Sequence, residues 1–148
     1  MNEQAEAPHE PFHEPAPPSA DFMLRILVKM ARKGDESPVT LFVKGTVISG
    51  FLIGQRKYLE HFAALLTRGW DDDEAVAEIR DSFGLNEPET LPDDSEEDDD
   101  AAPPWFIHLR DAKVFSPGQP LAPENSLIWR GRLSEVDGYS HGIFQNTG

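Results

Sequence analysis

The stretch PVTLFVKGTVISGFLIG, residues 38–54, decides the fold of this chain. Val39, Leu41 and Val43 occupy every second position, which is the period of a strand with one buried face. The second alternating set consists of Val47, Ser49, Phe51 and Ile53. Because the Lys44-Gly45 step between the two sets supplies a turn, we predict an antiparallel hairpin with both faces partly covered. Gly50 inside the second strand indicates a bulge or a sharp bend.

A short amphipathic helix is predicted before the hairpin, from about Asp21 to Gly34, where glycine ends it. Its apolar residues follow the spacing i, i+3, i+4, i+7 and are expected to face the core. They are Met23, Ile26, Leu27 and Met30. The outer face of this helix is predicted to carry a basic stripe formed by Arg25, Lys29, Arg32 and Lys33.

Two more helices are predicted after the hairpin. The first starts at about Lys57 and stops near Gly69, and its marker residues are Tyr58, Phe62 and Leu65. The second has Asp71 or Asp72 as its N-cap and acidic residues in its first turn, where they favour the helix dipole. Gly84 ends it, and its inward residues are predicted to be Val76, Ile79 and Phe83.

Three strands are predicted C-terminal to these helices. WFIHLRDAKVF, residues 105–115, alternates, and LIWRGRLSEVDGYSHGIF, residues 127–144, supplies the last two strands as a closing hairpin with Asp137-Gly138 in its turn. The predicted order is helix, two strands, a helical insertion and three strands. This order favours an α+β fold: a small bent antiparallel sheet or partial barrel, Sm-like or SH3-like, with an N-terminal helix and a helical insertion between strands 2 and 3.

Two segments lack the apolar content of a folded core. Residues 1–20 contain five of the 13 prolines, and residues 88–104, PETLPDDSEEDDDAAPP, are dominated by like charge. We expect a disordered Pro-rich arm at 1–20 and a single α+β domain at 21–148 that contains a disordered acidic linker at 88–104. Two roles stay open for the linker: a solvated spacer, or an electrostatic partner of the basic stripe.

The net charge of −14 is concentrated in one region. Residues 71–100 hold 15 acidic side chains and a single basic one, Arg80, so the other 118 positions carry equal numbers of each sign. Such an acidic surface repels phosphates, which nucleic-acid binding proteins hold with Lys and Arg, so nucleic acid is not an expected partner. The apolar stretch FMLRILVKM is interrupted by two charges and is too short to cross a bilayer, so membrane insertion is not expected either.

The chain offers few candidates for chemistry, and we predict no catalytic, cofactor-binding or metal-binding residues. It has no cysteine, which suits a cytoplasmic protein. Ser140 and His141, with Asp137 nearby, have the residue types of a hydrolytic triad, but neighbours on a strand point to opposite faces. His9 and His13 lie among prolines that prevent a helix from placing both on one face.

Four segments resemble the gas vesicle protein U (GvpU) family: TLFVKGTVISGFLI, RKYLEHFA, FIHLRDAKVF and, most specifically, WRGRLSEVDGYSHG. The resemblance covers about residues 39–143. It implies a non-enzymatic accessory protein of the cytoplasm, associated with gas vesicles, that promotes their assembly, maturation or clustering. Gas vesicle shell or other gas vesicle proteins are the implied partners, together with self-association.

Weak, multivalent and salt-sensitive contacts give this role a physical basis. The residues expected to make them are Arg25, Lys29, Arg32, Lys33, Arg130, Arg132, Asp98, Asp99 and Asp100. Two alternatives stay open. One is a Sm-like or SH3-like adaptor that binds a protein or nucleic-acid partner unrelated to gas vesicles, and the other is a small hydrolase whose pocket would collect His108, His141 and an acid.

Overall fold

A computed structural model describes residues 21–88, 106–116, 118 and 127–143. The predicted arm, most of the predicted linker and Asp98, Asp99 and Asp100 lie outside these residues. The elements, in chain order, are α1 (Phe22–Arg32), β1 (Ser37–Val43), β2 (Thr46–Ile53), α2 (Gln55–Leu66), α3 (Asp73–Ser82), β3 (Phe106–Phe115), β4 (Leu127–Arg132), the 3-10 turn η2 (Leu133–Glu135) and β5 (Gly138–His141).

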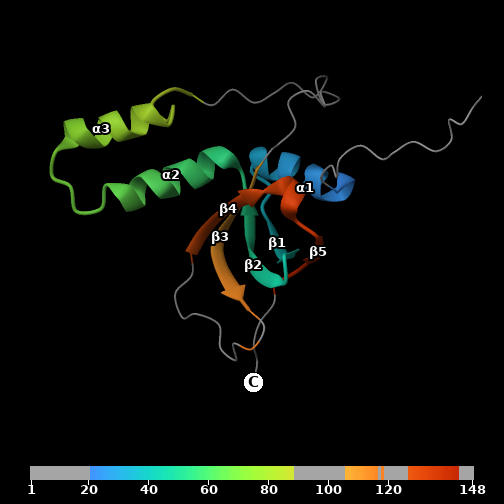
Figure 1. Cartoon of the computed structure of the whole chain (residues 1–148). Helices are drawn as coiled ribbons and strands as arrows, with labels where there is room; N and C mark the ends of the chain where they lie inside the picture. Colours follow the sequence, from blue (N-terminus) through green and yellow to red (C-terminus); the bar gives the residue numbers. More distant parts are fainter. Residues whose placement is uncertain (1–20, 89–105, 117, 119–126, 144–148) are drawn as a thin grey trace, which may run out of the picture.

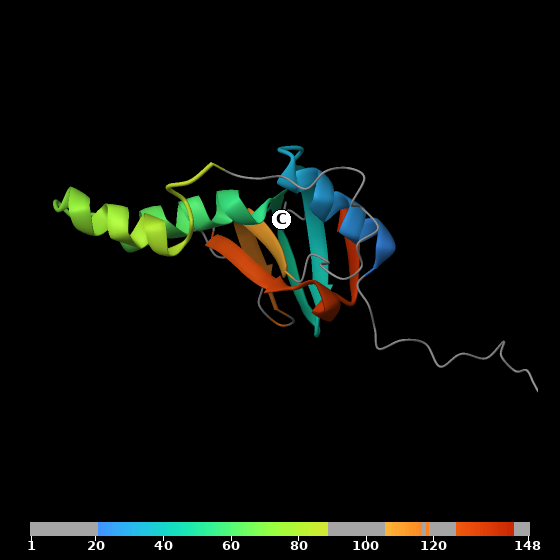
Figure 2. The same cartoon turned by 90° about the horizontal axis from the view of Figure 1, so that it is seen from above.

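The strands form one antiparallel sheet in the order β4-β3-β2-β1-β5, which bends but does not close into a barrel (Figure 1). α1 lies against one face of the sheet, and the α2–α3 insertion between β2 and β3 extends away from it (Figures 1 and 2). The predicted α+β class, partial barrel, N-terminal helix and helical insertion are confirmed.

The β1–β2 hairpin forms as predicted, with Val43 paired to Thr46 across a two-residue turn. Lys44 and Gly45 both have positive φ, 50° and 82°, as the tight turns that match strand twist require. The carboxylate of Asp137 accepts a hydrogen bond from the Lys44 amide at 2.8 Å, and the Lys44 ammonium lies 3.2 Å from Glu135. The turn is therefore held from outside as well as by its own geometry.

The bulge predicted at Gly50 is present, and its extra residue belongs to β3. Ser49 pairs with Lys113 and Phe51 with Arg110, so one residue of β2 lies opposite two residues of β3. A Cβ atom on Gly50 would lie 2.9 Å from the Arg110 carbonyl oxygen and 3.0 Å from the Ala112 Cα. Glycine is thus required because the bulged backbone comes too close for any side chain.

The core lies between α1 and the sheet. The buried residues that form it are Leu24, Val28, Ala31, Val39, Leu41, Ile48, Leu52, Ile107, Leu109, Ala112 and Leu133. Trp129 on β4 and Tyr139 on β5 pack against this cluster, so both edge strands contribute to it.

The predicted inward face of α1 is wrong for three of its four residues. Met23, Ile26 and Met30 are exposed, and only Leu27 packs partly against the core. The buried stripe, Leu24, Val28 and Ala31, also has helical spacing. Gly54 favours burial of this stripe, because it lets the last turn of α1 pack directly on the backbone before α2. A Cβ at Gly54 would lie 3.0 Å from the Arg32 Cα and 3.1 Å from the Ala31 carbonyl oxygen.

The predicted closing hairpin at residues 127–144 is also wrong. β4 pairs with β3 and β5 pairs with β1, so the two strands occupy opposite edges of the sheet. η2 connects β4 at one edge of the sheet to β5 at the other, and its first residue, Leu133, is buried. The Asp137 amide donates to the Phe42 carbonyl at 2.8 Å, which delivers β5 to β1 rather than back to β4.

The two helices predicted after the β1–β2 hairpin are present as α2 and α3, and they form a helical hairpin. Asp72 caps α3 by accepting from the amides of Glu74 and Ala75, and Gly69 ends the preceding helical segment with a positive φ. The rings of Phe62 and Phe83 stack at 5.8 Å between the two helices. α3 itself has no buried residue. Within the described residues no helix has the length and apolar character to span a membrane.

Candidate interaction surfaces

The outer face of α1 combines apolar and basic side chains. We call its four exposed large apolar residues the helix patch: Phe22, Met23, Ile26 and Met30 are 69, 63, 42 and 40 % exposed. The predicted basic stripe, Arg25, Lys29, Arg32 and Lys33, runs beside this patch. The segment from Phe22 to Lys33, which lies between Asp21 and Asp35, contains four basic residues and no acidic residue.

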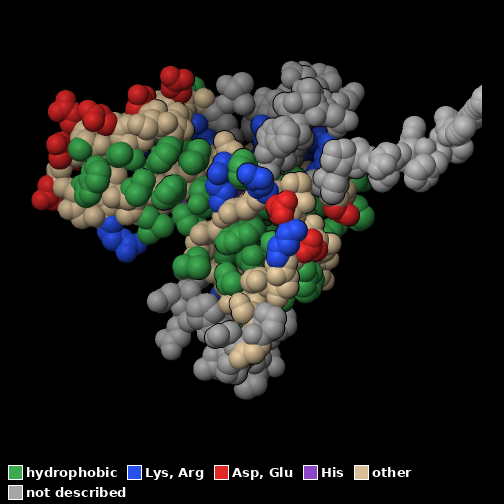
Figure 3. All heavy atoms as spheres, viewed as in Figure 1, with side chains coloured by type: hydrophobic (Ala, Val, Ile, Leu, Met, Phe, Trp, Pro, Cys, Tyr) green, Lys and Arg blue, Asp and Glu red, His purple; other side chains and the backbone are tan. Residues whose placement is uncertain are grey.

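A second apolar surface lies near the turn between α2 and α3. We call it the hairpin patch: Leu65, Leu66 and Trp70 are 47, 44 and 45 % exposed. Hydrophobic side chains line the helical hairpin, and acidic side chains border its outer edge (Figure 3). Residues 65–82 carry six acidic residues and two basic residues, Arg68 and Arg80, so this segment is acidic where the α1 segment is basic.

A histidine fastens α2 to the sheet. His108 on β3 is only 3 % exposed, its ring centroid lies 4.8 Å from that of Tyr58 on α2, and its Nε2 accepts a hydrogen bond from Arg130 Nε at 3.1 Å. Burial, and then the nearby Arg130 charge, lower the pKa of His108 to about 4. The ring is therefore neutral at physiological pH and acts as an acceptor.

Arg130 was predicted as an outward contact, and the structure gives it an internal role too. Its guanidinium lies 3.7 Å from the centroid of the Phe106 ring while its Nε reaches His108. Arg132, which pairs with Phe106 across β3 and β4, is exposed on the same strand. Alternation along β4 correctly placed both arginines on one face, but their partners come from β3 and were not predicted.

An ionic cluster joins three elements on one side of α2. Glu36, between α1 and β1, accepts from Arg110 Nε on β3 at 3.0 Å and from the Lys57 ammonium on α2. The Lys57 hydrogen bond, assisted by Arg110, lowers the pKa of Glu36 below its usual value. The Arg110 guanidinium also lies 4.3 Å from the Phe51 ring centroid.

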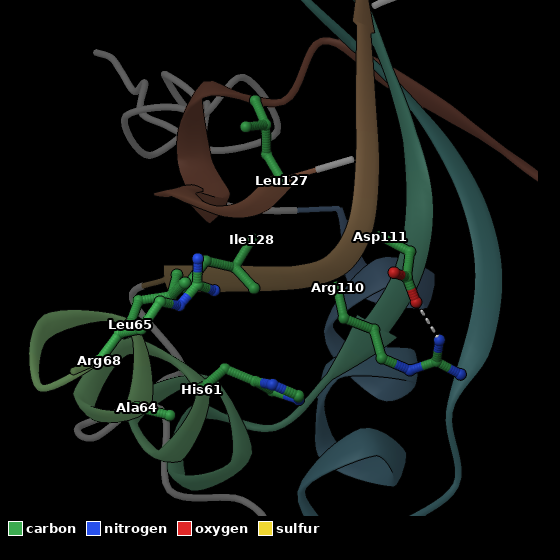
Figure 4. Close-up of a pocket in the computed structure, with 8 residues that line it drawn as sticks. All are labelled: His61, Ala64, Leu65, Arg68, Arg110, Asp111, Leu127 and Ile128. Atoms are coloured by element: carbon green, nitrogen blue, oxygen red, sulfur yellow. Dashed lines mark hydrogen bonds and ion pairs between the residues drawn. The ribbon is translucent and has the colours of Figure 1, made fainter. Parts of the chain in front are cut away.

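A cleft of about 690 Å³ opens between α2 and the β3–β4 edge (Figure 4). Its lining consists of His61, Ala64, Leu65, Arg68, Arg110, Asp111, Leu127 and Ile128. Leu65 of the hairpin patch borders it, and Arg110 is engaged there with Asp111. No motif in the sequence indicated this cleft, because it depends on how the insertion packs on the sheet.

The hydrolase alternative is not supported by the arrangement of its residues. His108 lies on β3 and His141 on β5, three strand positions apart, which corresponds to roughly 14 Å. His141 and Ser140 are exposed, and Asp137 is used in the turn contact with Lys44. Across the described ranges no three metal-ligating side chains of the His, Cys, Asp or Glu type come together. His9 and His13 lie outside them.

The bent sheet, its covering helix and its helical insertion define a small α+β fold whose five-stranded antiparallel sheet stays open. The chain belongs to the GvpU-like family: the family model described as "Gas vesicle protein GvpU-like" matches residues 21–144. This family is a gas vesicle accessory family, so the predicted family membership is confirmed. No curated protein and no solved structure matches the chain.

Proposed function

We propose that this protein is a non-enzymatic gas vesicle accessory protein of the cytoplasm that promotes vesicle clustering, and with it assembly or maturation, through many weak contacts. The observation that carries the proposal is the separation of two exposed apolar patches of opposite charge, on α1 and on the helical hairpin, in a chain of a gas vesicle family. Proteins that bridge large particles need at least two contact surfaces, and several weak contacts sum through effective concentration.

The proposed partners are the vesicle shell or other vesicle proteins, and further copies of this protein. Residues 21–148 would act as one domain whose acidic linker at 88–104 adds a highly charged contact. The predicted contact residues on the basic side are Arg25, Lys29, Arg32, Lys33, Arg130 and Arg132, and on the acidic side Asp98, Asp99 and Asp100. Because surface charges are screened by salt, such clustering should be sensitive to ionic strength.

The proposal is tested with purified gas vesicles and purified protein. Addition of the protein should bundle the vesicles at low ionic strength, and light scattering and electron microscopy should report less bundling as salt increases. A variant in which the acidic residues from Asp93 to Asp100 are replaced by Asn and Gln should bundle less well. Bundling that is indifferent both to salt and to this variant would exclude the electrostatic mechanism, and absence of any bundling would exclude the clustering role.

A further inference from the structure

Exposed large hydrophobic side chains are concentrated on two surfaces of this molecule. Among the described residues nine such side chains are exposed, and seven of them belong to the helix patch or to the hairpin patch. The other two, Phe42 and Leu127, lie elsewhere on the sheet. Single exposed apolar residues are normal, whereas a cluster rimmed by charge is typical of a contact surface.

The two surfaces are complementary in charge. Four basic residues and no acidic residue lie between Phe22 and Lys33, next to the helix patch. Six acidic residues and two basic residues, Arg68 and Arg80, lie between Leu65 and Ser82, the segment that contains the hairpin patch. An apolar centre with opposite charges at its rim is the arrangement by which protein partners gain affinity from burial and orientation from charge.

The two surfaces cannot meet within one molecule as it is folded. α1 lies against one face of the sheet, while α2 and α3 project from the opposite side and away from α1 (Figures 1 and 2). α2 is anchored by the Tyr58–His108 ring contact and by the Lys57–Glu36 ion pair, which fix its direction. One molecule therefore cannot cover either patch with the other by closing on itself.

We propose that the hairpin patch of one copy docks on the helix patch of a second copy, so that molecules join head to tail. The central anchors are Trp70 and Leu66 on one side and Ile26 and Met30 on the other. Such a contact is heterologous: a growing chain keeps one unused helix patch at one end and one unused hairpin patch at the other. Association is thus open-ended, and this deepens the proposed clustering role by naming the surfaces through which copies join.

The test uses two variants of the full chain that each lose one half of the contact. The helix variant carries Met23→Gln, Ile26→Gln and Met30→Gln, and the hairpin variant carries Leu66→Gln and Trp70→Gln. All five side chains are at least 40 % exposed, and glutamine maintains helix propensity, so both proteins should fold. Far-UV circular dichroism and thermal melts verify this. Phe42→Gln is the matched control, because it removes an exposed apolar residue outside the two patches. Leu127 is not used as a control, because it lines the same cleft as Leu65 of the hairpin patch.

Wild-type protein should form a concentration-dependent series of oligomers by sedimentation velocity at low ionic strength. Each variant alone should associate at least about tenfold more weakly, the loss expected when a hot-spot residue is removed. An equimolar mixture of the two variants should form a dimer and stop there, because only one intact helix patch and one intact hairpin patch remain to meet. The Phe42→Gln control should behave as wild type.

Several results would overturn the inference: a monomeric wild type, a variant that associates as wild type does, a Phe42→Gln control that weakens association equally, or a mixture that stays monomeric although both variants are folded. The last result would mean that the two patches serve different contacts. The vesicle bundling assay separates this outcome from failure of the proposed function, since bundling that persists without head-to-tail association overturns only the inference.

Discussion

Protonation of His108 should make this protein acid-labile in a pH range where few other groups titrate. In the folded protein the imidazole is buried against Tyr58 and accepts from Arg130, and its pKa falls from 6.5 to about 4. Since the unfolded chain binds the proton first, the stabilising effect of neutral His108 is complete above pH 6.5. It is lost progressively as the pH falls from 6.5 toward 4.

The size of the effect follows from the two pKa values. The free energy of unfolding should fall by about 1.3 kcal/mol between pH 7.5 and pH 5.5, and by about 2.5 kcal/mol by pH 4.5. Because the side chain is 3 % exposed, solvent screening should not remove most of this. The change between pH 7.5 and pH 5.5 is the more specific measure of His108, because carboxylates titrate mainly below pH 5.

Urea unfolding of wild type and His108→Gln at pH 7.5 and 5.5 measures this pH dependence of the free energy of unfolding. Glutamine does not titrate and offers an oxygen to Arg130 Nε, so the variant should lose stability at both pH values but should lack the difference of about 1.3 kcal/mol between them. His141→Gln is the control, because His141 is exposed on β5. An equal pH dependence in wild type and His108→Gln would refute the assigned protonation state of His108.

Three further changes test the architecture, each by thermal or urea unfolding. Gly50→Ala should destabilise by about 1–3 kcal/mol because its Cβ would strike the β3 backbone, and a loss below about 0.5 kcal/mol would contradict this close approach. Asp72→Ala should lower the free energy of unfolding by about 1 kcal/mol by removing the N-cap of α3, whereas Asp71→Ala should change it little. Equal losses in the two variants would contradict the assignment of Asp72 as the N-cap. Glu36→Gln should reduce the stability lost as pH falls below 4.5, since the depressed pKa of Glu36 stabilises the fold above that value; unchanged acid sensitivity would argue against the cluster with Lys57 and Arg110.

Local patterns in the sequence were sufficient for the elements and for several of their details. The β1–β2 turn at Lys44-Gly45 and the Asp72 cap depend on residues that are close together in sequence, and Gly50 by itself indicated a bulge. Gly50 illustrates the limit of local patterns. Glycine in a strand indicated a close approach of the backbone, but only the pairing with β3 shows that the extra residue of the bulge lies near Asp111, whose φ is 51°.

The inward face of α1 and the closing hairpin were predicted wrongly for the same physical reason. In each case two arrangements fitted the local sequence pattern equally well. α1 has two apolar stripes with helical spacing, and the choice between them is made by the contact of its last turn with Gly54, 22 residues beyond Arg32. Residues 127–144 alternate as a hairpin would, yet Asp137 binds Phe42 and Lys44, about 95 residues earlier in the chain. The cleft and the His108–Arg130 contact likewise arise only once distant segments pack.

The position of the helical insertion gives the two patches their geometry. α1 covers the face of the sheet that carries Leu41 and Ile48, whereas α2 packs beside His108 on the opposite face. The single-layered sheet therefore separates the helix patch from the hairpin patch. Its paired strands make this separation rigid, which disfavours closure of one molecule on itself. Under the proposed contact each added copy must extend the assembly, so a domain this small could connect particles much larger than itself.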